Sequence, residues 1–136
     1  KTRNTKMKKK VLIIGANYYQ NILENLISLA KHSLEKRKIK YKTIIVPGVF
    51  EIPVVISKNI KKYDGFIALG CVIKGETPHF DFISKAATDG IMNISINYKK
   101  PVGNGILTCL NQNQALVRSK SKGQEAADAV ISILSL

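Results

Sequence analysis

The chain alternates between short apolar runs and longer segments with helical spacing. The apolar runs occupy residues 11–15, 42–47, 64–73 and 101–110. Three of them are apolar on both faces, and the fourth becomes so after its glycines, which is typical of buried parallel strands. Strands that alternate with helices predict a three-layer αβα sandwich. We therefore expect an α/β, flavodoxin-like fold, with a four-stranded parallel sheet and helices on both faces.

Helical periodicity fills the segments between these runs. Apolar residues recur every three or four positions between Tyr19 and Leu34, which predicts the first helix. A second helix is expected to begin near Phe50, because Pro53 then falls in its first turn, where proline is tolerated. Further helices are predicted over residues 80–93, 112–118 and 123–134.

The sequence indicates one domain preceded by a short basic segment. Residues 1–10 hold six of the 22 basic side chains and are predicted to form a disordered tail, whereas residues 11–136 form the single domain. No apolar run reaches the ~20 residues that a membrane span needs, and no hydrophobic signal core follows the basic start. We expect a cytoplasmic protein without a membrane partner.

The net charge of +13 raises the question of a nucleic-acid partner. Beyond the first ten residues, however, the basic side chains are scattered, often side by side at predicted helix ends, as Lys61 and Lys62 are. They are not accompanied by zinc-finger spacing, by aromatic–basic alternation or by a clear helix-turn-helix pattern. The sequence therefore favours solvated surface lysines and predicts no nucleic-acid partner.

Cysteine and histidine usage argues against a metal site. Cys71 and Cys109 each lie in or beside an apolar segment, and there is no CxxC pair. Two buried free thiols are therefore expected instead of a disulfide framework. The chain has only two histidines, without paired ligand spacing, so we expect no zinc.

The residues that follow the predicted strands are the chemically unusual ones. In an open parallel sheet, ligands bind beyond the carboxyl ends of the strands. GANYY follows the first strand, VPGVFEIP the second, CVIKGETPHF overlaps and follows the third, and NQNQALVR follows the fourth. Aromatic, acidic, imidazole and guanidinium groups therefore converge on one edge of the sheet, where we expect the functional site.

Each of these groups has a functional and a structural interpretation. His79 could transfer protons near neutral pH, or only pack, as we expect of His32 on an exposed helix face. Arg118 could grip a phosphate bidentately or be an ordinary surface arginine. Tyr18 could stack on a flat heterocycle or fill the core, and Glu51 could bind hydroxyl groups or cap a helix. Together they predict an enzyme that binds a phosphate and a ring and uses a histidine for proton transfer.

Four stretches of the chain carry a resemblance to a known family. VPGVFEIP, YDGFIALGCVIKGETPHFDFI, PVGNGILT and KGQEAADA resemble the lumazine synthases, in that order and at family-like spacing. The resemblance covers residues 11–136. It implies condensation of 5-amino-6-(D-ribitylamino)uracil with 3,4-dihydroxy-2-butanone 4-phosphate, giving 6,7-dimethyl-8-ribityllumazine, phosphate and water. This is the penultimate step of riboflavin biosynthesis, a transferase reaction that needs no metal and no organic cofactor.

The resemblance also implies a role for each residue at a matching position. His79 stands where the family has its proton-transfer histidine. Asn104 falls where many members have a phenylalanine that the neighbouring subunit contributes. The family positions that bind the butanone phosphate correspond here to Glu76, Thr77, Arg118 and Lys122. The family positions that bind the aminopyrimidine ring and the ribityl chain correspond here to Tyr18, Val49, Phe50, Glu51, Cys71, Val72, Ile73 and Asn104.

Family members are pentamers, some of which close into icosahedral shells, and their sites lie between adjacent subunits. Here only SKSK separates Arg118 from Gly123, where many shell-forming members have a longer glycine-containing loop. The segment before Val11 also has little strand character. We therefore expect a homopentamer without a shell. Riboflavin synthase is a candidate partner.

Alternative functions remain open from the sequence. Some relatives bind lumazine or riboflavin without making it, so a non-catalytic carrier of the same fold is the main alternative. His79 and Arg118 argue against it, because a carrier needs neither proton transfer nor phosphate binding. The archaeal type of riboflavin synthase shares the fold, but GETPHFDF fits lumazine synthase better.

Overall fold

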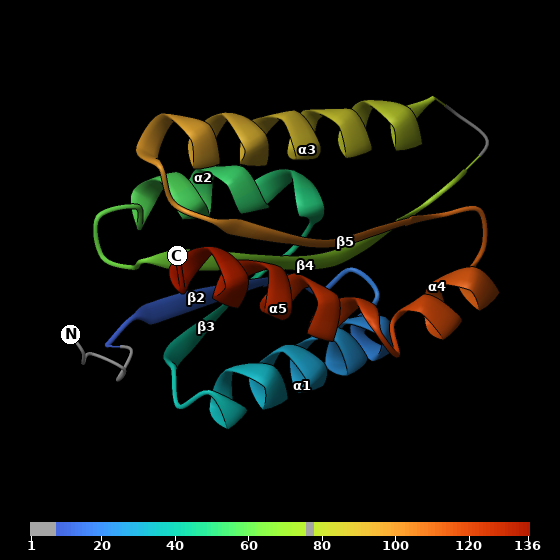
Figure 1. Cartoon of the computed structure of the whole chain (residues 1–136). Helices are drawn as coiled ribbons and strands as arrows, with labels where there is room; N and C mark the ends of the chain where they lie inside the picture. Colours follow the sequence, from blue (N-terminus) through green and yellow to red (C-terminus); the bar gives the residue numbers. More distant parts are fainter. Residues whose placement is uncertain (1–7, 76–77) are drawn as a thin grey trace.

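A computed structural model of the 136-residue chain describes residues 8–75 and 78–136 (Figure 1). Most of the predicted basic tail therefore falls outside the described residues, as do Glu76 and Thr77. The described chain begins at Lys8, and strand β2 already begins at Lys10.

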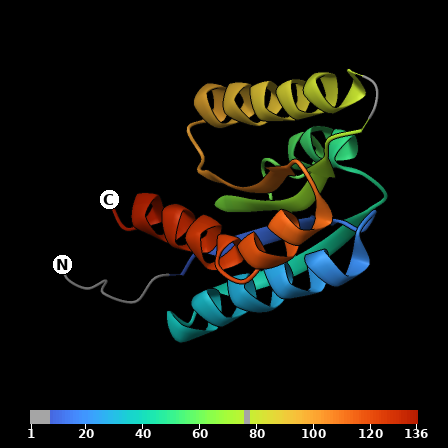
Figure 2. The same cartoon turned by 90° about the vertical axis from the view of Figure 1, so that its right-hand side faces the viewer.

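Four parallel strands form one sheet in the order β3-β2-β4-β5. The strands are β2 (Lys10–Ala16), β3 (Lys40–Val46), β4 (Gly65–Ile73) and β5 (Val102–Cys109). The helices are α1 (Gln20–Lys36), the 3₁₀ turn η1 (Val49–Glu51), α2 (Ile52–Lys58), α3 (His79–Tyr98), α4 (Gln112–Arg118) and α5 (Lys122–Leu134). Figures 1 and 2 show α2 and α3 on one face of the sheet and α1 and α5 on the other. The predicted three-layer α/β sandwich is confirmed.

Two apolar layers hold the helices onto the sheet. Alternate residues of β2 point to opposite faces, so Val11 and Ile13 pack under α1 and α5, and Leu12 and Ile14 pack under α2 and α3. All four side chains are fully buried. β2 is therefore covered on both faces, which explains its lack of polar alternation.

Two sequence expectations differ from the structure. β3 is an edge strand in which Ile45 is 49% exposed, so the expectation of burial on both faces is wrong for this strand. The third helix begins at His79 and continues to Tyr98, five residues past the predicted end. It stops where Lys99 adopts a left-handed conformation, with φ 56°, two residues before Pro101.

Helices α1 and α5 approach each other through a glycine. A Cβ atom on Gly123, in the first turn of α5, would lie 2.1 Å from the Leu26 carbonyl oxygen of α1. Backbone cannot yield as a side chain can, so any larger residue would push the two helices apart. The close packing fixes where α4 ends and α5 begins, beside the carboxyl edge of the sheet (Figure 1).

The Gly123→Ala change is expected to lower the free energy of unfolding by about 1–3 kcal/mol, because overpacking outweighs the better helix propensity of alanine. Urea denaturation at fixed protein concentration measures the change. Gly75→Ala is the matched control, since a Cβ atom there meets nothing within 4 Å. An unchanged midpoint for Gly123→Ala would contradict the close packing.

Candidate active site

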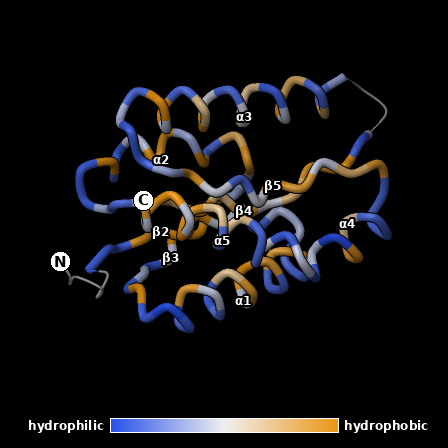
Figure 3. The backbone as a smooth tube through the Cα atoms, in the orientation of Figure 1, coloured by the Kyte–Doolittle hydropathy of each residue, from blue (hydrophilic) through white to orange (hydrophobic). Residues whose placement is uncertain are grey.

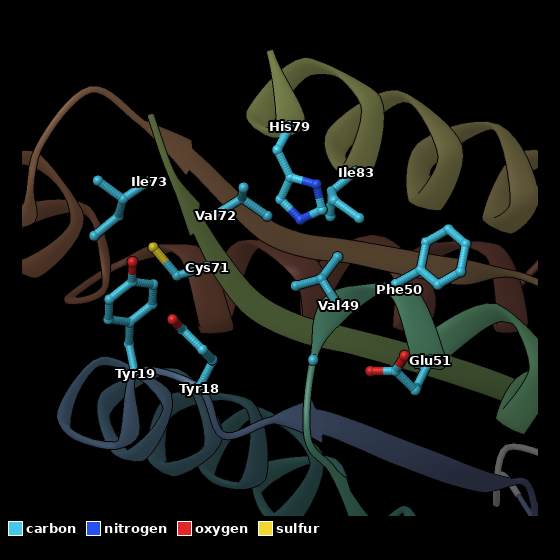
Figure 4. A pocket seen from close by; sticks show the side chains of 11 residues that line it. Tyr18, Tyr19, Val49, Phe50, Glu51, Cys71, Val72, Ile73, His79 and Ile83 are labelled. Carbon is cyan, nitrogen blue, oxygen red and sulfur yellow. The ribbon is translucent and has the colours of Figure 1, made fainter. Parts of the chain in front are cut away.

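The sheet order creates a crevice at the carboxyl edge. The chain leaves β2 toward β3 on one side and returns to β4 on the other, so the connections after β2 and β3 diverge at this point. A cavity of about 650 Å³ lies there, large enough for a small-molecule ligand. Its lining comes from the β2–α1 connection, η1, the end of β4 and the first turns of α3 (Figure 4).

The turn after β3 forms one wall of the cavity. Val49 is buried, whereas Phe50 is 59% exposed, and both line the cavity with Glu51. A Cβ atom on Gly48 would lie 2.9 Å from a Glu51 carboxylate oxygen, so the glycine lets this carboxylate fold back over the turn. A Cβ atom on Gly70 of β4 would likewise lie 2.9 Å from Val49 Cγ2, which shows how closely the turn seats against the strand.

Two adjacent tyrosines form the opposite wall. Tyr19 is half-buried and packs against the core beneath α1, while Tyr18 is 76% exposed. Their rings meet edge to face, with centroids 5.0 Å apart and an interplanar angle of 82°. Tyr19 therefore packs against the core, and Tyr18 keeps a ring surface available to a ligand.

The start of α3 supplies the imidazole. His79 is the first residue of the helix, and Figure 4 shows its ring directed from α3 toward the turn that carries Val49. Ile83 follows one helical turn later and lines the same cavity. The predicted helix 80–93 thus begins one residue earlier, at His79 itself, and His32 lies exposed on α1 as expected.

Comparison with known proteins identifies the family. The family model for 6,7-dimethyl-8-ribityllumazine synthase matches residues 8–136. The chain is 40% identical to the protein of that name from Bartonella tribocorum, covering 96% of this chain and 92% of the relative. It is 39% identical to the Agrobacterium fabrum protein of the same name, covering 95% of each. The chain belongs to the 6,7-dimethyl-8-ribityllumazine synthase family. This confirms the resemblance drawn from its motifs.

Eight residues that the lumazine synthase resemblance singled out line this one cavity. They come from four separate segments and are Tyr18, Val49, Phe50, Glu51, Cys71, Val72, Ile73 and His79. Three further lining residues were not predicted for the site: Tyr19, Gly48 and Ile83. The spacing of four residues between His79 and Ile83, which puts both on one helix face, is the sequence signal that would have added Ile83.

Three other predicted residues, all within the described part of the chain, do not line the cavity. Arg118 ends α4 and borders a separate hollow of about 790 Å³, with Nη1 3.4 Å from the Thr108 carbonyl oxygen. Lys122 is the first residue of α5 and is half-buried. Asn104 lies mid-strand in β5, opposite Ala68, and its side-chain oxygen accepts from its own strand, at Ile106. Glu76 and Thr77 lie outside the described residues.

Arg118 lies close to the two cysteines. Burial first, and the neighbouring Cys109 second, raise the pKa of the Cys71 thiol to about 12, while the positive charge of Arg118 opposes the shift. Arg118 Nη1 also lies 3.7 Å from Cys109 Sγ. Both cysteines are buried free thiols, as expected. The guanidinium therefore contacts the end of β5 without lining the cavity itself.

Neither a metal cluster nor a membrane helix is found in residues 8–75 and 78–136. No group of three His, Cys, Asp or Glu side chains gathers there in a way that could hold a metal ion. None of the helices in this part of the chain combines the length and apolar character needed to cross a membrane.

Cys71 is expected to resist alkylation in the folded protein. At pH 8, a pKa of about 12 instead of 9.0 leaves about 1000-fold less thiolate. Iodoacetamide labelling of the Cys71 peptide, followed by mass spectrometry, should be at least ~100-fold slower than in urea. Because the folded pKa is the higher one, stability from this thiol is fully present below the ordinary pKa of 9.0 and is lost as pH rises toward 12. Equal labelling rates in both states would contradict the buried, protonated thiol.

Proposed function

We propose that this chain condenses 5-amino-6-(D-ribitylamino)uracil with 3,4-dihydroxy-2-butanone 4-phosphate at the cavity between η1, β4 and α3. The products are 6,7-dimethyl-8-ribityllumazine, phosphate and water. The observation that carries the proposal is the meeting of eight residues, from four segments, around one cavity with a histidine at its rim. Family membership supplies the reaction, and the cavity supplies groups that fit it.

The cavity suits a flat ring with a polyol chain. Val49, Cys71 and Val72 offer an apolar wall, and the exposed Tyr18 ring can cover the face of a heterocycle. Glu51 carries its carboxylate on the same side as the η1 turn, where it can accept hydrogen bonds from ribityl hydroxyls. The apolar wall also excludes water, which favours imine formation over hydrolysis.

His79 is the group that moves protons. Imine formation requires a proton on the departing hydroxyl, and phosphate elimination requires removal of a proton from carbon. One imidazole can serve both steps in turn, since it donates in one form and accepts in the other. Its position at the start of α3 puts it at the rim of the cavity.

The phosphate side is completed by groups outside the cavity lining. Arg118 contacts Cys109, and its charge reaches the Cys71 thiol that lines the cavity. Its planar guanidinium can hold a phosphate bidentately, with Lys122, Glu76 and Thr77 as the further phosphate-side residues that the family resemblance supplies. This assignment puts the phosphate beside Arg118 at the end of α4, apart from the aromatic wall at Tyr18.

Assembly into a homopentamer would complete the site between adjacent subunits. Several large apolar side chains are exposed on α3 and α4, among them Phe82 at 68%, Ile96 at 63% and Val117 at 66%. Exposed apolar surface of this kind marks interaction sites. Asn104 cannot reach the cavity of its own chain from mid-strand in β5, so we assign it to the cavity of a neighbouring subunit.

The His79→Ala change is expected to lower kcat for lumazine formation by about 10²–10⁴-fold, because proton transfer is lost. Arg118→Ala should instead raise KM for the butanone phosphate by about 10–100-fold, with a smaller effect on KM for the aminopyrimidine. Absorbance and fluorescence of the lumazine report the rates against an uncatalysed blank.

His32→Ala and Arg37→Ala are the matched controls, since both positions are exposed and far along the sheet from the cavity. These two changes should leave kcat and KM within about twofold of the wild-type values. A wild-type protein that binds lumazine but gives no rate above the blank would instead support the non-catalytic carrier.

The pentamer has its own test. Sedimentation equilibrium should give about 75 kDa, five times the 15.0 kDa of one chain. Val117→Asp should dissociate the assembly and abolish activity with it, because it puts a charge at an exposed apolar position of α4 that the pentamer would bury. Ser28→Asp, at an exposed position on α1, is the control and should change neither. A fully active monomer would rule out a site shared between subunits.

A further inference from the structure

The end of the sheet opposite the cavity carries most of the positive charge. We call residues 8–10, 36–42, 58–64 and 99–100 the basic end, since they form the amino ends of strands and the segments after α1, α2 and α3. These ranges hold thirteen Lys and Arg side chains and one carboxylate, that of Asp64. Figure 3 shows several hydrophilic segments at this end of the molecule, on the left of the view.

Contacts join the four ranges into one surface. Lys10 lies opposite Lys40 in the β2–β3 ladder. The Lys10 amide donates to the Asp64 carboxylate at 2.9 Å, and the Asp64 amide donates to the Lys10 carbonyl at 2.8 Å. Lys100 Nζ donates to the Tyr63 carbonyl at 2.9 Å, which ties the segment after α3 to the segment after α2. Residues scattered along the sequence are therefore neighbours in space.

The charges of the basic end are not neutralised within the described chain. In residues 8–75 and 78–136 the ion pair lies elsewhere, between Lys85 and Asp89 on α3. Asp64 accepts from a backbone amide, and Glu35, just outside the basic end, accepts from the Tyr41 hydroxyl. The carboxyl ends of three helices add only about half a negative charge each. A strong positive potential therefore remains, and it attracts a polyanion.

We propose that the basic end binds the phosphate backbone of nucleic acid without reading its sequence. Twelve of the thirteen basic residues are lysines, with Arg37 the exception, and lysine offers a compact charge instead of a fork that can read a base edge. Phosphate contacts alone give affinity without sequence preference. The scatter along the sequence, which argued against such a partner, does not describe the folded surface.

The same surface fits a membrane or a protein partner poorly. Within the described ranges of the basic end, no large apolar side chain is exposed. Peripheral membrane binding needs apolar side chains that insert beside the basic ones. Protein interfaces need buried aromatic or aliphatic anchors. A ligand recognised by charge alone is therefore favoured.

Fluorescence anisotropy with a labelled 20-nucleotide uridine homopolymer tests the proposal on the full chain. If about five phosphates are neutralised, affinity should fall ~100-fold between 50 and 200 mM salt. The triple variant Lys40→Gln, Lys61→Gln, Lys62→Gln should bind at least ~10-fold more weakly at 50 mM salt, with a salt slope about 2 units shallower. The control variant Lys31→Gln, Lys85→Gln, Lys120→Gln loses the same charge elsewhere and should bind within about threefold of wild type.

Three outcomes would overturn the proposal. Equal weakening in both variants would mean that net charge, and not the basic end, governs binding. Absence of homopolymer binding at 50 mM salt would exclude nucleic acid as a partner of the basic end. Binding to vesicles containing phosphatidylserine, without binding to the homopolymer, would make the basic end a membrane surface. None of these readouts depends on lumazine formation, so the outcome is independent of the proposed catalytic function.

Discussion

The pairing of β2 with strands on both of its sides is the constraint on which the rest of the molecule depends. Val11 to Ile14 are buried on both faces, so β2 can occupy only an interior position of the sheet. With β3 on one side and β4 on the other, the chain must cross over at β2. The crevice at the carboxyl edge follows directly from that crossing.

The same topology separates the two ends of the molecule by function. In a parallel sheet with helical crossovers, helices start at the carboxyl edge and end at the amino edge. The N-terminus of α3 therefore brings His79 to the cavity, while the segments after α1, α2 and α3 carry their lysines to the far end. Ligand chemistry and positive charge are thus kept apart, and a polyanion at one end would leave the cavity at the other open.

The sequence predicted the strands best where a strand is covered on both faces, and least well where a strand lies at the edge of the sheet. The run from Gly65 to Ile73 has one meaning, a covered strand, and its predicted limits fall within one residue of β4. The run 42–47 has a similar composition, yet β3 lies at the edge, because a single chain carries no sign of which strand will lack a neighbour. The residues that line the cavity could be predicted from the sequence, because the loops that follow parallel strands converge at one edge of the sheet. The sequence could not predict that Arg118 and Asn104 lie outside the cavity lining. The distance of Arg118 from the cavity depends on how α4 packs, and that of Asn104 depends on its position along β5.

Small residues determine how tightly the cavity is built. Gly48 allows the Glu51 carboxylate to lie over the turn, and Gly70 allows Val49 to lie against β4 between the two central strands. Neither glycine has a positive φ, so both are required by the space around them and not by backbone conformation. A wall packed this closely leaves little room to move on the β4 side. Any adjustment to substrate must therefore come from the exposed Tyr18 and Phe50, or from the neighbouring subunit that we expect to close the cavity.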